Sequence, residues 1–138
     1  MQRRRRLRER IETRIARKKG EDVFLPREFR DLAGEDQVLR ALRAMVADKQ
    51  LVRIGYGVYG RARISSLNGQ VYLSCPNGLI GAARQVLNKL GVPWDLTEAQ
   101  KAYNERRSTQ VPVNPVIAVK GRLSRRLSAG NWEVVYVR

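Results

Sequence analysis

Apolar residues recur along the first part of the chain with the spacing of a helix that buries one narrow face. Leu7, Ile11 and Ile15 stand four residues apart, and most of the positions between them are charged. This pattern predicts a helix over about residues 4–19, on the outside of its domain. Gly20 follows the helix and can end it.

Two further helices are expected before the first pair of strands. Pro26 suits the first turn of a short helix that Gly34 ends. A longer helix is expected from an N-cap at Asp36 to about Asp48. Its apolar face consists of Val38, Leu39, Leu42, Met45 and Val46. Its other face consists of Gln37, Arg40, Ala41, Arg43 and Ala44.

Short extended segments complete the first half of the chain. Residues 23–25 form an apolar piece, and residues 51–54 and 58–63 predict a β-hairpin around the turn Gly55-Tyr56-Gly57. Glycine supplies the positive φ that such turns need. The order of helix, short strand, helix, helix and hairpin predicts a winged helix-turn-helix domain over residues 1–63.

The second half predicts a smaller lobe. Turn-forming residues dominate residues 64–78, which are expected to connect two lobes. Helices are expected at residues 79–90 and after Thr97, which can cap one. Short strands are expected at residues 71–73, 111–113, 116–119 and 132–137. The expected fold class is α+β, with an N-terminal winged helix-turn-helix followed by a small α+β C-terminal lobe over residues 79–138.

The charge of the chain points to an anionic partner. The 138 residues include 28 Lys and Arg against 13 Asp and Glu, a net charge of +15. So high a charge repels itself in a compact state, and nucleic acid is the commonest partner that neutralises it. No apolar run approaches the roughly 20 residues that span a bilayer. No apolar segment follows the N-terminal arginines, as a signal peptide would require. We therefore expect a cytoplasmic protein without a membrane partner.

The composition argues against catalysis. The chain has no histidine, which removes the usual zinc sites and most general-base arrangements. Cys75 is the single cysteine and is interpreted as a small hydrophobic residue. The acidic residues of the second half form no metal-ligand pattern: Asp95, Glu98, Glu105 and Glu133. We expect no enzyme, no metal and no cofactor.

The third predicted helix and the hairpin carry the candidate contacts to DNA. In the major groove Gln bonds adenine and Arg bonds guanine in bidentate fashion, while other basic side chains contact phosphates. The candidate DNA-binding residues are Arg3, Arg4, Arg5, Arg6, Gln37, Arg40, Arg43, Ala44, Arg53, Tyr56, Arg61 and Arg63. A solvated basic face is the competing interpretation. Glu35 and Asp36 would repel phosphate, or would face a protein partner.

Later basic residues are candidates for a second phosphate contact: Arg106, Arg107, Arg122, Arg125 and Arg126. The first two follow a predicted helix and are equally suited to bonding its free carbonyls. The other three occupy an expected loop over residues 121–130, whose alternative is simple solvation. Trp94 and Trp132 are of a type that stacks on unpaired bases, but their apolar context favours core packing.

Several segments resemble the N-terminal winged helix of the AbiEi antitoxin family. They are residues 23–29 (VFLPREF), 31–34 (DLAG), 37–46 (QVLRALRAMV) and 51–59 (LVRIGYGVY). Residues 103–115 (YNERRSTQVPVNP) resemble a feature of one short branch of that family. Lys49-Gln50 stands where winged helices often place glycine before the first hairpin strand.

The resemblance implies a bacterial type IV toxin–antitoxin role. Such a protein represses its own operon by binding double-stranded operator DNA through the winged helix, as a homodimer if the half-sites are inverted. It counteracts a nucleotidyltransferase-like toxin, often without stable contact. The alternatives from the residues themselves are an RNA-binding module and a protein-interaction adaptor.

Overall fold

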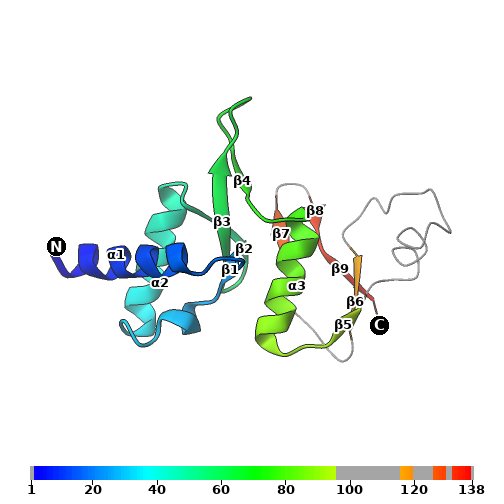
Figure 1. Cartoon of the computed structure of the whole chain (residues 1–138), viewed down its shortest axis with the longest axis horizontal. Helices are drawn as coiled ribbons and strands as arrows, with labels where there is room; N and C mark the ends of the chain where they lie inside the picture. The colour runs from blue at the N-terminus through cyan, green and yellow to red at the C-terminus, as the bar shows by residue number, and fades with distance from the viewer. Residues whose placement is uncertain (1, 96–115, 120–125, 130–131, 138) are drawn as a thin grey trace. The chain divides into compact units, whose positions relative to one another are not determined.

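The chain divides into two compact units, Met1–Ser74 and Cys75–Arg138. The computed structural model describes residues 2–95, 116–119, 126–129 and 132–137. Helices and strands occur in both units, so the expected α+β class is confirmed (Figure 1).

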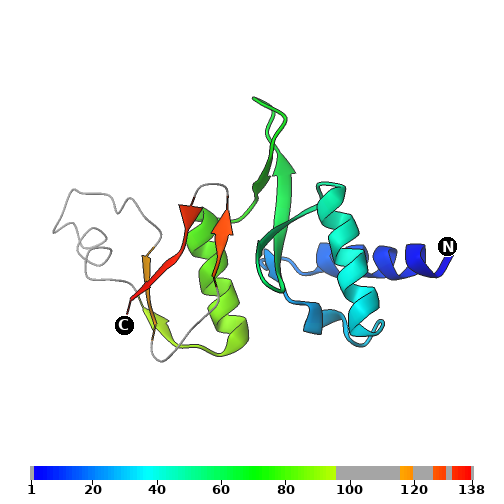
Figure 2. The ribbon, with the colours of Figure 1, turned by 180° about the vertical axis from the view of Figure 1, so that it is seen from behind.

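The first unit begins with helix α1 (Gln2–Arg17), close to the predicted range. Ile11 is fully buried and Ile15 nearly so, because the four-residue spacing puts both on the face that packs against the rest of the unit. α1 crosses helix α2 (Glu35–Ala47) in both views (Figures 1 and 2). The narrow apolar stripe is thus part of the core, while the remaining faces of α1 lie outside.

The short helix expected after Pro26 is a single 3-10 turn, η1 (Pro26–Phe29). Its backbone bonds join residues three apart, as between Glu28 N and Leu25 O at 3.0 Å. Further turns follow until α2 begins. A segment this short gains too few i→i+4 bonds to offset the cost of nucleating an α-helix. Phe29 is fully buried and anchors the turn.

Helix α2 was expected to start from an Asp36 cap, and that cap was wrong. Gly34 is the N-cap, and Val38 N bonds Gly34 O at 3.0 Å. Asp36 therefore lies inside the first turn. Its negative charge there stabilises the helix by a favourable interaction with the helix dipole.

The C-terminal end of α2 is a Schellman motif. Gln50 N bonds Met45 O at 2.9 Å and Lys49 N bonds Val46 O at 3.0 Å. Lys49 has φ +65°, a left-handed conformation that glycine adopts more readily. The position noted in the sequence as lacking glycine is therefore one where the backbone favours it.

The predicted hairpin is confirmed as β2 (Leu51–Gly55) and β3 (Val58–Ile64) around Tyr56-Gly57. Gly57 has φ +64° in this turn. β1 (Val23–Phe24) pairs antiparallel with the other edge of β3, which gives the order β1-β3-β2. The three short extended segments of the sequence thus form one sheet.

The segment expected to connect two lobes differs from the prediction. The strand expected at residues 71–73 is confirmed as β4 (Val71–Leu73), but it pairs with the end of β3, so this part of the segment belongs to the first unit. The turn-forming residues make the tip of this ribbon, where Ser65 N bonds Gln70 O at 2.8 Å. Figure 2 shows β3 and β4 projecting beyond the helices of the first unit. The boundary between the units accordingly lies after Ser74 instead of Arg63.

One apolar cluster joins the elements of the first unit. Helices α1 and α2, the turn η1 and strands β1, β2 and β3 all contribute to it. Its buried members are Ile11, Ile15, Phe24, Phe29, Val38, Leu42, Met45, Leu51 and Tyr59. The α2 residues in it stand three and four apart, as the sequence pattern predicted.

The second unit contains helix α3 and short strands. α3 (Gly78–Leu90) confirms the helix expected at residues 79–90, and Gly91 ends it with φ +72°. The strands are β5 (Trp94–Asp95), β6 (Val116–Val119), β7 (Ser128–Ala129), β8 (Trp132–Glu133) and β9 (Val135–Val137). β6 pairs antiparallel with β5 and parallel with β9, and β7 pairs with β8.

The structure of this unit differs from the sequence predictions in two places. The strand expected at residues 132–137 is two strands separated by the buried Val134. Residues 128–129, expected in a loop, are paired as β7. The helix expected after Thr97 and the strand at residues 111–113 lie outside the described residues.

Candidate nucleic-acid interface

The outward face of α2 carries the polar side chains that the sequence predicted. Val38, Leu42 and Met45 are buried, so residues offset from them around the helix point away from the core. Gln37, Arg40 and Arg43 are exposed, and Ala44 is half-buried. In the part of the chain that the structure describes, no hydrogen bond or ion pair engages the three exposed side chains. They are available to a ligand without breaking an internal contact.

The β2–β3 hairpin presents a second exposed group. Tyr56 in its turn is 83% exposed, and Arg53 and Arg63 on its strands are exposed. Arg53 Nε bonds Gly55 O at 3.3 Å, and its guanidinium lies 6.0 Å from the centre of the Tyr56 ring. The turn therefore displays an aromatic ring and a cation together.

Arg61, also expected to contact phosphate, is occupied within the first unit. Its guanidinium donates to Ile15 O at 2.7 Å, Lys18 O at 2.8 Å and Glu21 O at 2.8 Å. It also lies 5.1 Å from the centre of the Phe24 ring. These carbonyls belong to the last turn of α1 or to the residues that follow it. Carbonyls at the C-terminal end of a helix have no hydrogen-bond partner within the helix. We therefore remove Arg61 from the candidate DNA contacts.

Two cations of α1, and Lys18 directly after it, are likewise used inside the first unit. Arg8 bonds Glu12 at 2.9 Å and Asp48 at 2.6 Å, which ties α1 to the end of α2. Arg14 holds both oxygens of Asp31, at 2.6 and 2.7 Å. Lys18, directly after α1, pairs with the Glu28 carboxylate at 3.1 Å, which ties the end of α1 to η1. These pairs set how the segment from η1 to α2 lies against α1.

The ion pair between Arg14 and Asp31 predicts that the stability of the first unit depends on pH. The hydrogen bond from Arg14 lowers the pKa of Asp31 from 3.8 to about 2. Because the folded pKa is the lower one, the pair stabilises the fold above about pH 4 and loses this effect as pH falls toward 2. We expect wild type to unfold at a higher temperature than Asp31→Asn at neutral pH, with the gap closing over that range. A gap independent of pH would contradict the assignment.

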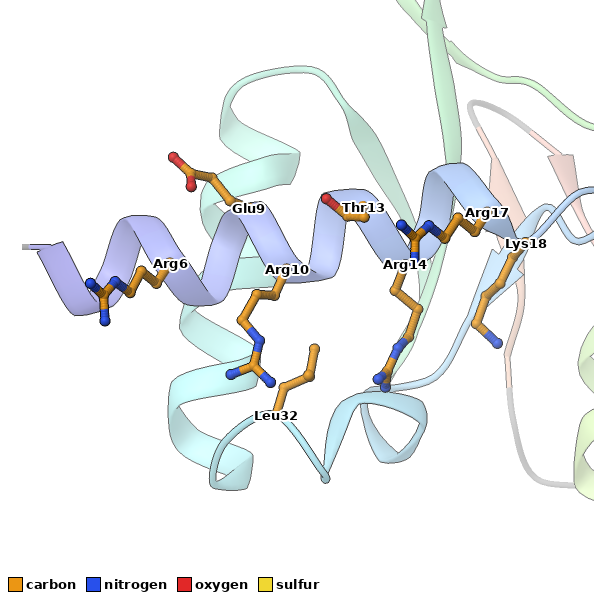
Figure 3. Close-up of a pocket in the computed structure, with 8 residues that line it drawn as sticks. All are labelled: Arg6, Glu9, Arg10, Thr13, Arg14, Arg17, Lys18 and Leu32. Carbon is orange, nitrogen blue, oxygen red and sulfur yellow. The ribbon is translucent and has the colours of Figure 1, made fainter.

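Basic side chains of α1, together with Lys18 directly after it, line a groove (Figure 3). The groove has a volume of about 670 Å³ and is lined by Arg6, Arg10, Arg14, Arg17 and Lys18, with Glu9 as an acidic neighbour. Thr13 and Leu32 complete the lining. Arg6 was among the candidates predicted from the sequence, but the groove was not predicted. The available signal was the spacing of Arg6, Arg10, Thr13 and Arg17, which puts them on one side of a helix.

The other candidates are only partly placed. The side chains of Arg3, Arg4 and Arg5 on α1 lie outside the described part of the structure, as do Arg106, Arg107, Arg122 and Arg125. Arg126 is exposed, 3.9 Å from the Glu133 carboxylate. No second phosphate surface is therefore assembled from described residues of the second unit.

Two side chains of the second unit have contacts within that unit. Trp94 is half-buried, its indole N–H bonds Asn88 Oδ1 at 2.8 Å, and the Arg84 guanidinium lies 5.2 Å from its ring centre. Trp94, interpreted from the sequence as a core residue, is therefore only partly packed. The side chain of Trp132 lies outside the described residues. Cys75 is half-buried, and Gln85 Nε2 approaches its sulfur at 3.7 Å.

Two other kinds of feature are absent from the described residues. Among them, no three His, Cys, Asp or Glu side chains gather in a way that would hold a metal ion. No helix there has the length and apolar character to cross a membrane.

Comparisons with known proteins do not extend this description. No protein-family model, no curated protein and no solved structure gave a significant match to the chain.

Proposed function

We propose that the first unit is a winged helix-turn-helix domain that binds double-stranded DNA, with α2 in the major groove and the β2–β3 hairpin beside it. The observation that carries this proposal is the exposed and unengaged face of α2, formed by Gln37, Arg40 and Arg43 within the described residues. The major groove is wide enough for one helix, and Gln and Arg are the side chains that bond adenine and guanine edges there.

The order of the elements supports the same proposal. α1, β1, η1, α2 and the hairpin follow one another, and β3 lies between β1 and β2. A helix-turn-helix holds its recognition helix in the groove by packing it on earlier helical elements. Here η1 takes the position of the middle helix, and Phe29 joins the apolar cluster under Val38 and Leu42.

The charges of the unit restrict how α2 approaches DNA. Glu35 and Asp36 occupy its first turn and repel phosphate. We therefore place the middle of α2, from Gln37 to Arg43, against the base edges. Arg53 and Arg63, on the hairpin, supply contacts to the phosphates, which position a protein without reading sequence.

The decisive variant is Arg43→Ala, tested on a duplex that the wild type selects from a randomised pool and on a scrambled duplex. A bidentate Arg–guanine contact discriminates by about 1–3 kcal/mol, so we expect the dissociation constant for the selected duplex to rise about 5- to 150-fold. The scrambled duplex should change much less. Fluorescence anisotropy at fixed salt measures both.

The matched control is Arg30→Ala, which removes an exposed cation from the turn between η1 and α2. It should alter both duplexes equally and slightly. If Arg43→Ala also affects both duplexes equally, α2 contacts phosphates only and the sequence-reading role is lost.

For the biological role, we place this binding at an operator in the chain's own operon, in the cytoplasm, as the repressor and antitoxin of a type IV toxin–antitoxin system. A reporter behind the native promoter should be repressed by wild type and released by Arg43→Ala. Co-expression of the chain should restore growth that a nucleotidyltransferase-like toxin inhibits.

The alternatives give different results. If structured RNA displaces the bound duplex at a lower concentration than competitor DNA does, an RNA-binding module is favoured instead. Absence of nucleic-acid binding near physiological salt would favour a protein adaptor.

A further inference from the structure

The groove along α1 is a concentrated cationic surface separate from the exposed face of α2. Five of its lining side chains are basic and one, Glu9, is acidic. Leu32, just before α2, contributes its other wall (Figure 3). The groove therefore opens beside the segment that leads into the helix proposed to read DNA.

The basic side chains of the groove have two different roles. Arg14 and Lys18 are paired with Asp31 and Glu28, so they hold the groove in shape. Arg6, Arg10 and Arg17 are exposed, and no hydrogen bond or ion pair among the described residues engages them. Two ion pairs therefore fix the groove, and three exposed guanidinium groups in its lining can bind an anion without breaking them.

The lining favours phosphates over an acidic protein. Protein interfaces depend on a few buried aromatic or apolar anchors, and Leu32 is the one apolar side chain in this lining. Phosphates need only donors, which Arg guanidinium groups and the Thr13 hydroxyl provide. Arg6 and Arg17 are eleven residues apart, about 16 Å along the helix axis. That distance corresponds to about five nucleotides of one DNA strand at 3.4 Å each.

We propose that the α1 groove binds the phosphodiester backbone of the same duplex that α2 reads, through Arg6, Arg10 and Arg17. This inference rests on the proposed DNA-binding function and adds to it a sequence-independent clamp. The strand that flanks the α2 site passes along α1, and these three side chains neutralise its phosphates. The groove then contributes affinity and salt dependence, while α2 contributes sequence preference.

The test is the salt dependence of binding by the full chain with Arg6→Gln, Arg10→Gln and Arg17→Gln combined. Each phosphate contact contributes about 0.9 to the slope of log affinity against log salt. We expect the slope to fall by about 2–3, and to the same extent on the selected and scrambled duplexes. The charge-retaining triple variant with Lys at these positions should keep the wild-type slope, because phosphates require charge.

The matched control is Lys19→Gln, Arg30→Gln and Lys49→Gln, which removes three exposed cations outside the groove. A circular dichroism melt establishes that each variant folds. An unchanged slope in the groove variant, or an equal fall in the control, overturns the clamp while leaving the Arg43 result intact. A fall confined to the groove variant, with Arg43→Ala showing no selective loss, supports the clamp and overturns sequence reading by α2. Failure of wild type to bind either duplex overturns both.

Discussion

Replacing Arg61 with Met should lower the free energy of unfolding of the first unit by about 3 kcal/mol. The substitution keeps an unbranched stem near Phe24 but removes the guanidinium that three carbonyl oxygens share. Hydrogen bonds from a charged donor contribute about 1.5–3 kcal/mol each, and Arg61 is partly exposed, so the sum is well below three full bonds. Chemical denaturation of the full chain, followed by hydrogen exchange of α1 and α2 amides, measures the effect.

Arg63→Met is the matched control for this prediction. Arg63 lies two residues along the same strand and is exposed, so its loss should change stability by no more than about 0.5 kcal/mol. Its loss should instead weaken DNA binding. Equal stability of the two variants would show that Arg61 does not brace the end of α1. It would also return Arg61 to the candidate phosphate contacts.

Replacing Gly81 with Ala should destabilise the second unit, although alanine is the better helix former. In the interior of an exposed helix the change would stabilise by up to about 1 kcal/mol. At Gly81 the added Cβ would collide with the backbone oxygen of Pro76. A backbone atom cannot rotate away as a side chain can, so the first turn of α3 must shift. We expect a net loss of about 1–3 kcal/mol, the usual cost of overpacking.

Hydrogen exchange on the full chain separates this effect from global changes. Protection of α3 amides should fall in Gly81→Ala, while amides of α2 in the other unit serve as the internal reference. Combining the change with Pro76→Gly gives a double-mutant cycle. The extra backbone freedom at residue 76 should reduce the cost of the added methyl group. Increased protection of α3 would mean that helix propensity outweighs the collision.

Long periodic elements were predictable because their pattern is local. The apolar spacing of α2 and the glycine turn of the hairpin each lie within about a dozen residues. The structure differs from the predicted bounds by one residue in the hairpin and by two at the start of α2. η1 is shorter than the helix expected between Pro26 and Gly34, because residues that start and stop a helix do not specify the hydrogen bonds between them. The tip of the β3–β4 ribbon was interpreted as a connection between lobes. Turn-forming residues predict a change of chain direction, but they do not specify that the strands on either side pair with each other.

The candidate site was predictable to a smaller extent. Periodicity alone placed Gln37, Arg40 and Arg43 opposite the buried face of α2, and exposure of the three side chains agrees. It did not distinguish Arg61 from Arg63, since both are arginines on one strand. It also did not reveal that Arg10 and Arg17 share a groove with the segment before α2.

By itself, the sequence determined the excess of cations, the helix faces and the hairpin, because composition and short-range spacing specify them. Only the tertiary structure decided which cations remain free to meet an anion. Arg14 and Arg61 are held by groups 17 and up to 46 residues away, whereas no hydrogen bond or ion pair with a described residue holds Arg10 or Arg43. Whether a cation is available depends on the carboxylates and carbonyls that folding brings within bonding distance, and residue spacing along the chain does not contain that information.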